Sequence, residues 1–152
     1  SNKGQNVIGD IELRARNKGV EPEFVEIDQE SWKSALTKTT DLLKTLVEVE
    51  KFDPSQITLL SPHSLNVKDI KNMKYSNTKS IEGLGVNISS VFQFKGLEND
   101  IVILLVPNYK SLETTYIRNP LNLIYVGVSR AKYLLYLVGN KEIKKLINWD
   151  KS

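Results

Sequence analysis

The sequence of 152 residues contains no cysteine, and it has no apolar run long enough to cross a bilayer. The absence of cysteine excludes a disulfide scaffold and a thiolate metal site. No segment combines the charged start and short apolar core of a signal peptide. We therefore expect a soluble cytoplasmic protein with neither a membrane partner nor a metal site of its own.

A second absence concerns nucleotide chemistry. The sequence has no Gly-x-x-x-x-Gly-Lys-Ser/Thr phosphate-binding loop, and no buried strand ends in an acidic Walker B residue that would bind magnesium. Hydrolysis of a nucleoside triphosphate needs both elements to hold the phosphates and the metal ion. The isolated chain is therefore predicted to be inactive as an ATPase.

The composition is that of one compact domain. A hydrophobic content of 40% over 152 residues is enough for one core and leaves little room for a second. The net charge of +3 is compatible with a polyanionic partner without requiring one. We interpret residues 1–152 as a single domain, and the polar start at Ser1-Asn2 as that of a domain excised from a longer chain.

Short apolar strands alternate with amphipathic helices along the chain, which is typical of a parallel sheet covered on both faces. The fourth strand has a continuous Ile-Val-Ile-Leu-Leu-Val run, which predicts a central position in the sheet. Between Leu65 and Gly85 the pattern is weak, and we expect mostly connection there. The five expected strands are at residues 23–27, 57–60, 86–91, 100–106 and 133–138.

Three helices are predicted from apolar residues spaced by three and four positions. The first extends from about Gln29 to Glu50, with Asp28 as its N-cap. The second begins at Pro120 and is capped by Asn119, and the third begins at Lys141. Together with the strands they predict a doubly wound α/β fold with helices on both faces of the sheet.

The first segment with functional content is Ser90-Val91-Phe92-Gln93-Phe94-Lys95-Gly96-Leu97-Glu98, directly before the fourth strand. It resembles motif V of UvrD/Rep-type superfamily 1 DNA helicases. The resemblance implies that the segment lies at the carboxyl edge of the sheet, where ligands bind in open α/β folds, and that Gly96 allows a ligand to approach the backbone. It also implies that Glu98 contacts the nucleotide ribose, whereas Ser90, Phe92 and Gln93 face single-stranded DNA. Taken alone, a surface turn explains the segment equally well.

The second segment is Leu123-Ile124-Tyr125-Val126-Gly127-Val128-Ser129-Arg130-Ala131-Lys132, which leads into the fifth strand and is similar to motif VI of the same family. The resemblance implies that Arg130 is the arginine finger that contacts the nucleotide, because a guanidinium offers planar paired donors to γ-phosphate oxygens. A solvated arginine at a helix end is the alternative. The order of motif V, strand, connection, motif VI and strand favours the helicase interpretation.

The strand end Leu59-Leu60-Ser61-Pro62-His63-Ser64 also bears comparison with the family, in which a similar turn approaches the nucleic-acid backbone. The resemblance makes Ser61, His63 and Ser64 candidate phosphate contacts, although a plain turn residue explains His63 equally well. Three positions depart from the family pattern: Ser90 and Ser129 stand where Thr is frequent, and Phe92 where His is frequent. A phenyl ring loses the hydrogen-bonding group of histidine but keeps a flat surface on which a base can stack.

The resemblance as a whole implies a second RecA-like motor domain, with the mostly parallel sheet of P-loop NTPases, from an ATP-dependent DNA helicase or translocase. ATP and Mg²⁺ would be bound mainly by the first RecA-like domain of the same polypeptide, and single-stranded DNA would be the other partner. Larger relatives insert an accessory domain after the equivalent of Ser64. Here about two dozen residues precede Ser90, too few to fold as an independent domain.

Two alternatives remain at this stage. A non-catalytic α/β module could retain the fold and bind a nucleotide or a protein partner. A receiver-like or flavodoxin-like domain fits the alternation of strands and helices, but the chain lacks acidic clusters and a phosphate-binding loop at its strand ends. The sequence also leaves open whether the protein unwinds duplexes or only translocates, and whether its track is DNA or RNA.

Overall fold

The computed structural model describes residues 11–28, 31–62, 85–91, 93–94, 96–112 and 122–149. Within these ranges, five strands form one sheet in the order β1-β5-β4-β2-β3, and every neighbouring pair is parallel. The predicted parallel α/β sheet is confirmed, and so is the central position of the fourth strand. The strands are β1 (Glu21–Glu26), β2 (Ile57–Ser61), β3 (Asn87–Ser90), β4 (Asn99–Val106) and β5 (Ala131–Gly139).

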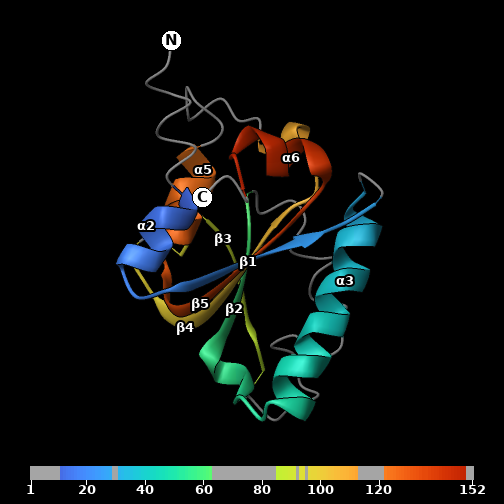
Figure 1. Ribbon diagram of the computed structural model, residues 1–152. Helices are drawn as coiled ribbons and strands as arrows, with labels where there is room; N and C mark the ends of the chain where they lie inside the picture. The colour runs from blue at the N-terminus through green and yellow to red at the C-terminus, as the bar shows by residue number, and fades with distance from the viewer. Residues whose placement is uncertain are drawn as a thin grey trace.

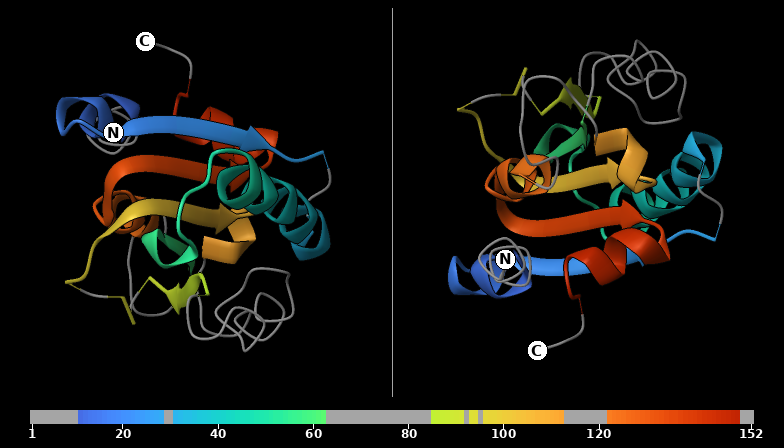
Figure 2. Two further views of the ribbon diagram at one scale, coloured as in Figure 1. Left: turned by 90° about the horizontal axis from the view of Figure 1, so that it is seen from below. Right: turned by 90° about the horizontal axis from the view of Figure 1, so that it is seen from above.

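Helices cover both faces of the sheet (Figures 1 and 2). One face carries three helices whose buried residues share one core, and the other face carries α3 with a second core. This is the doubly wound arrangement that the alternating pattern predicted. The α-helices within the described ranges are α2 (Ile11–Asn17), α3 (Trp32–Lys44), α5 (Asn122–Val128) and α6 (Lys141–Leu146).

The central strand β4 explains why both cores form. Successive side chains of a strand point to opposite faces, so a continuous apolar run supplies both sides of the sheet. All of the side chains from 101 to 106 are at most 1% exposed. They alternate between the cores in this order: Ile101, Ile103 and Leu105 with α3, and Val102, Leu104 and Val106 with α2, α5 and α6.

The start of α3 corrects the sequence prediction. The N-cap is Ser31 rather than Asp28, because the Ser31 hydroxyl accepts a hydrogen bond from the N–H of Ser34 at 3.1 Å. Serine and aspartate cap helices about equally well, so the residue types alone did not distinguish the two positions. The apolar stripe of α3 packs on the sheet as predicted, and the helix continues into a π-helical turn at Thr45–Val49.

Helix α2 was not predicted. It is a single short helix in which Ile11 and Ala15 contact the core, and two apolar positions are too few to give a periodic pattern. The predicted cap and start of α5, at Asn119 and Pro120, lie outside the described residues. The described part of α5 and the start of α6 at Lys141 agree with the prediction.

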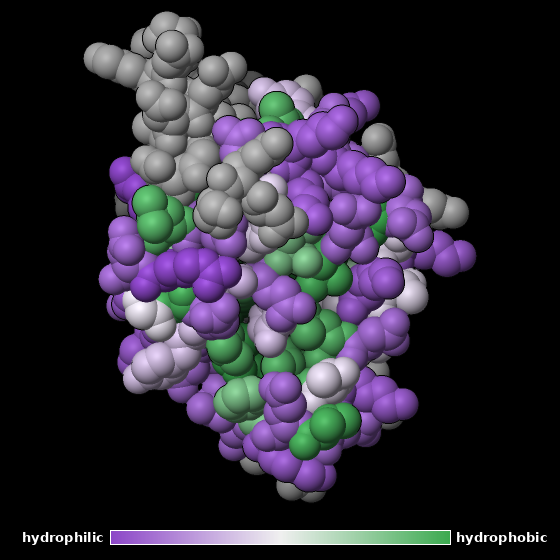
Figure 3. Space-filling view, viewed as in Figure 1, coloured by the Kyte–Doolittle hydropathy of each residue, from purple (hydrophilic) through white to green (hydrophobic). Residues whose placement is uncertain are grey.

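The surface in Figure 3 is mainly hydrophilic, with apolar side chains showing between β1 and α3. Partly buried residues such as Val25 of the edge strand β1 pack against the core that contains α3. Within the described ranges, no helix combines the length and the apolar character needed to cross a bilayer.

Candidate functional site

Glu98 and Arg130 lie next to each other at the amino edge of the sheet, which is the edge where the parallel strands begin. Glu98 immediately precedes β4 and Arg130 immediately precedes β5, and the two strands are neighbours in which Asn99 pairs with Ala131. The N–H of Asn99 donates to the carbonyl oxygen of Arg130 at 3.0 Å. The sheet thus joins the last residue of the motif V segment (residues 90–98) to the arginine of the motif VI segment (residues 123–132).

This position corrects one expectation. Ser90 ends β3 at the carboxyl edge, as predicted for the motif V segment, but Gly96 and Glu98 lie toward the opposite edge. The reason is topological: β3 and β4 are both parallel to β2, so the chain between them must return to the amino edge before β4 begins. The prediction of a carboxyl-edge position is therefore confirmed for Ser90 and wrong for Glu98.

Ser61 and Ser90 come together at the carboxyl edge. They are paired in register between β2 and β3, both are buried, and the N–H of Val91 donates to the carbonyl oxygen of Ser61 at 2.8 Å. The Ser90 hydroxyl accepts from the N–H of Gln93 at 3.1 Å, and the Gln93 side-chain oxygen accepts from the N–H of Ser90 at 3.4 Å. These reciprocal bonds form a tight turn, and of the three predicted contacts Gln93 is the exposed one.

Three other predicted nucleic-acid contacts, His63, Ser64 and Phe92, lie outside the described residues. Their neighbours Ser61 and Gln93 lie on the strand end and the turn described above. The structure thus divides the described candidates into two groups. Gly96, Glu98 and Arg130 lead into strands at the amino edge, whereas Ser61, Ser90 and Gln93 follow strands at the carboxyl edge.

The side chain of Arg130 has an unused hydrogen-bond donor. Arg130 is partly buried, and its Nε is buried without a hydrogen-bond partner among the described residues. A buried donor without an acceptor costs about 1–3 kcal/mol, so such a group fits a site where a ligand provides the acceptor. Phosphate oxygens of a nucleotide match the planar donors of a guanidinium.

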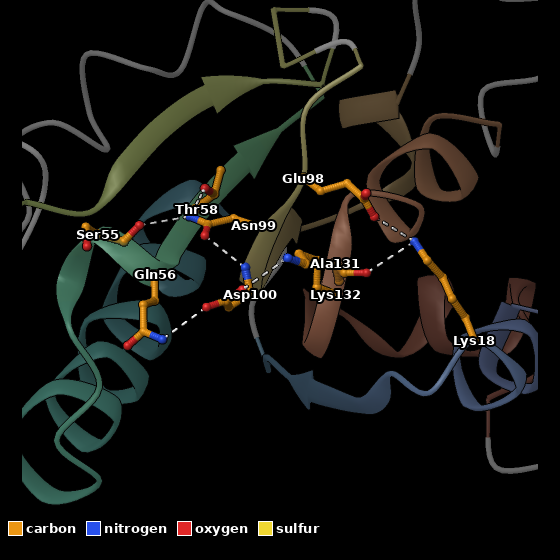
Figure 4. Close-up of polar contacts among 9 residues, drawn as sticks. All are labelled: Lys18, Ser55, Gln56, Thr58, Glu98, Asn99, Asp100, Ala131 and Lys132. Carbon is orange, nitrogen blue, oxygen red and sulfur yellow. Dashed lines mark hydrogen bonds and ion pairs between the residues drawn. The ribbon is translucent and has the colours of Figure 1, made fainter.

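Lys18 connects the two segments and was missed in the sequence. Its Nζ lies 3.0 Å from Oε2 of Glu98, and it donates to the carbonyl oxygens of Ser129 at 2.9 Å and Ala131 at 3.3 Å. Figure 4 shows Lys18, directly after α2, reaching toward Glu98 and Ala131. The contact with Glu98 spans 80 positions of sequence, and no local pattern around Lys18 signals it.

A polar network fixes the start of β4 directly after Glu98 (Figure 4). The side-chain amide of Asn99 donates to the carbonyl oxygen of Ser55 at 3.1 Å and to the hydroxyl of Thr58 at 2.9 Å. The carboxylate of the next residue, Asp100, accepts from the Gln56 amide at 3.0 Å. These contacts attach the strand start to the neighbouring β2 and so restrict the backbone next to Glu98.

Gly96 has a backbone conformation that favours glycine, with φ of +77°. No atom lies within 4 Å of the place where a Cβ would be, so backbone strain and not a clash decides the effect of a substitution there. We expect Gly96→Val to lower the free energy of unfolding by about 1–2 kcal/mol, because the left-handed region is costly for a branched residue. Urea unfolding of the chain measures this loss.

Gly96→Asn is the matched control, since asparagine adopts the left-handed region more readily than other residues with a side chain. It should be clearly less destabilising than Gly96→Val. Equal losses for the two variants would contradict the assignment of strain at this position.

A separate pocket of about 450 Å³ lies beside α6, and it is not part of this site. Because α6 follows the carboxyl end of β5, the pocket is at the opposite end of that strand from Arg130. Within the described ranges, no group of three or more His, Asp or Glu residues could hold a metal ion. Lining residues of the pocket are Glu26, Lys141, Lys144, Lys145, Asn148 and Trp149.

Comparison with known proteins locates the same two segments. A family profile for the UvrD-like helicase C-terminal domain matches residues 85–138, which include both the motif V and the motif VI segments. NFX1-type zinc finger-containing protein 1 from Mus musculus is 31% identical over 104 residues, and the protein of the same name from Homo sapiens is 30% identical over 104 residues. The alignments cover 67% of this chain but 5% of each relative, so the chain spans a small part of their length.

Among solved structures, the chain is similar to the C-terminal domain of a possible DNA helicase from Lactobacillus plantarum. The TM-score is 0.58 at 19% identity, and the alignment covers 97% of this chain and 90% of that one. This likeness shows the fold of nearly the whole chain, and the profile match covers the motif V and motif VI segments. Residues 85–138 of the chain are thus similar to the UvrD-like helicase C-terminal domain, and its fold is similar to that of a solved helicase C-terminal domain.

Proposed function

We propose that the chain is the second RecA-like motor domain of a superfamily 1 helicase or translocase, and that it supplies Arg130 to ATP bound between two motor domains. The observation that carries this proposal is the buried Nε of Arg130, which has no partner among the described residues. Arg130 lies on a turn next to Glu98, and its carbonyl oxygen accepts a hydrogen bond from the N–H of Asn99. A guanidinium with a donor that lacks a protein acceptor fits an anionic ligand that domain closure brings to it.

Phosphoryl transfer needs positive charge where negative charge develops on the γ-phosphate oxygens. The chain has no phosphate-binding loop, so the first RecA-like domain would hold the triphosphate and Mg²⁺, which neutralises phosphate charge. Arg130 would then complete the site from the facing side when the two domains close. Glu98 would accept a hydrogen bond from a ribose hydroxyl and fix the orientation of the nucleotide.

In the proposed motor, one edge of the sheet would contact the nucleotide and the opposite edge would contact the nucleic-acid strand. Nucleotide residues would act at the amino edge, and Ser61, Ser90 and Gln93 would border the nucleic-acid strand at the carboxyl edge. A strand of the length of β4 rises about 3.3 Å per residue, so the two contacts are separated by roughly 20–25 Å. Residues 91–98 connect the nucleotide contact directly to the nucleic-acid contact. Domain closure on ATP would therefore move the residues that contact the nucleic-acid strand.

The second candidate is a non-catalytic module that keeps the fold. One observation favours it: the chain has no phosphate-binding loop of its own. A module of this kind would bind a nucleotide or a protein without turnover. The two candidates therefore differ in catalysis and not in fold.

ATP hydrolysis by the full-length protein separates them. We expect ATP turnover to rise when single-stranded nucleic acid is added. The logarithm of the affinity for that nucleic acid should fall linearly with the logarithm of the salt concentration, because binding releases counterions. DNA and RNA strands of the same sequence, assayed in parallel, identify the track. Nucleotide binding without strand-stimulated turnover would support the module and contradict the motor.

A further inference from the structure

We propose that Lys18 is a positioning residue for the nucleotide: it orients Glu98 and neutralises its charge. This inference rests on the proposed function, because it assigns a new residue to the same site. Lys18 lies outside the segment matched by the family profile, residues 85–138. Lys18 belongs to neither motif segment, and its contacts with both segments form only in the folded chain.

The contacts of the Lys18 ammonium are complete. An ammonium has three N–H donors, and three acceptors lie within reach: Oε2 of Glu98 at 3.0 Å, the carbonyl of Ser129 at 2.9 Å and the carbonyl of Ala131 at 3.3 Å. Ser129 and Ala131 are the residues on either side of Arg130. One side chain therefore binds both the end of the motif V segment and the turn of the motif VI segment (Figure 4).

The fold places Lys18 firmly. It is the last residue before the glycine that ends α2, and Gly19 has φ of +88°, as expected at a helix end of this type. The N–H of Gly19 donates to the carbonyl of Arg16 at 3.0 Å, and the N–H of Val20 donates to that of Ala15 at 2.8 Å. These two bonds form a Schellman motif, which fixes the backbone from which Lys18 extends.

The charge of Lys18 matters because Glu98 would lie close to a triphosphate. A free carboxylate in that place repels the phosphates, whereas a carboxylate paired with an ammonium has little net charge. Lys18 occupies Oε2 of Glu98, and Oε1 has no hydrogen bond within the described part of the chain. The pair therefore leaves one carboxylate oxygen available for a ribose hydroxyl.

The ion pair is not a stability element. The Lys18 and Glu98 side chains are 45% and 47% exposed, and exposed pairs contribute little to folding. Loss of Lys18 should therefore change nucleotide binding while the thermal midpoint of the protein stays nearly constant. This difference separates a positioning role from a general structural one.

The test is Lys18→Met in the full-length protein, with ATP hydrolysis measured at saturating single strand. We expect KM for ATP to rise about three- to tenfold and kcat to stay within about twofold. This is the effect of losing roughly one charged contact that stabilises the bound substrate and the transition state equally. Lys18→Arg keeps the charge and should stay close to the unmodified protein. Lys141→Met, at the opposite edge, is the matched control and should leave KM unchanged.

A double-mutant cycle with Glu98→Gln identifies the cause. If Lys18 acts through the Glu98 carboxylate, Lys18→Met should have little further effect on KM in the Glu98→Gln background. Additive effects, or an unchanged KM for Lys18→Met alone, would overturn the inference. Lys18→Gln serves as a second variant should the methionine variant fold poorly.

The outcome is distinguishable from failure of the proposed function. Should the unmodified protein hydrolyse ATP in an Arg130-dependent way while Lys18→Met keeps its KM, the positioning role alone is wrong. Should the unmodified protein show no strand-stimulated hydrolysis, the motor assignment is wrong, and the role of Lys18 falls with it.

Discussion

Arg130→Ala is expected to lower strand-stimulated ATP hydrolysis by the full-length protein by about 10³- to 10⁵-fold, the scale of losing an arginine finger. The guanidinium is proposed to meet charge that develops in the transition state, so kcat should fall while nucleotide affinity changes little. Steady-state hydrolysis and equilibrium binding of a fluorescent nucleotide, measured on the same preparation, separate the two effects.

The matched controls for Arg130→Ala are two other changes at arginine. Arg130→Lys keeps the charge but loses the planar pair of donors, so it should restore little activity. Arg14→Ala removes an arginine of the same face whose guanidinium lies 5.1 Å from the Tyr125 ring centre, and it should leave turnover nearly normal. Near-normal turnover of Arg130→Ala would refute the assignment of the finger.

Leu104→Ala is expected to lower the free energy of unfolding by about 2–5 kcal/mol, the usual cost of a cavity left by a large buried side chain. Leu104 is fully buried on the central strand β4. Its two methyl carbons lie 2.8 and 3.0 Å from the place that a Cβ on Gly127 would occupy, so it packs directly under α5. Urea unfolding of the chain followed by circular dichroism measures the loss.

Val49→Ala is the control for Leu104→Ala, because Val49 is also aliphatic but 72% exposed. Its effect should stay within about 0.5 kcal/mol of zero, as for most surface substitutions. Similar losses at the two positions would mean that β4 is not the centre of the core. A cavity under α5 should also loosen the turn that follows it, which carries Arg130.

Much of the fold could be predicted from the sequence because the strands of a buried parallel sheet are continuous apolar runs. The run at residues 101–106 gave the central strand, and the start of α6 at Lys141 followed from residue spacing. The motif VI segment was predicted on a helix that leads into a strand, which α5 and β5 confirm. These features depend on neighbours in sequence, so a local pattern reveals them.

The rest depends on contacts between distant residues. Strand order brings Asn99 beside Ala131 and sends Glu98 to the amino edge, and no local pattern around Glu98 specifies that order. Lys18 reaches its partners from 80 or more positions away. The short helix α2 has too few apolar positions for a periodic signal, although it holds Lys18 in place.

Residues 91–98 connect the two edges of the sheet with only eight residues. They connect Ser90 at one edge of the sheet to Asn99 at the other, and the chain can span about 30 Å over that stretch only when fully extended. Two turns shorten it, with the N–H of Phe94 bonded to the carbonyl of Ser90 and the N–H of Leu97 to that of Phe94, both at 3.1 Å. Removing one residue from this short connection would break one of these turns or shift a neighbouring strand out of register, and a shift by one residue turns the side chains of a strand to the wrong face.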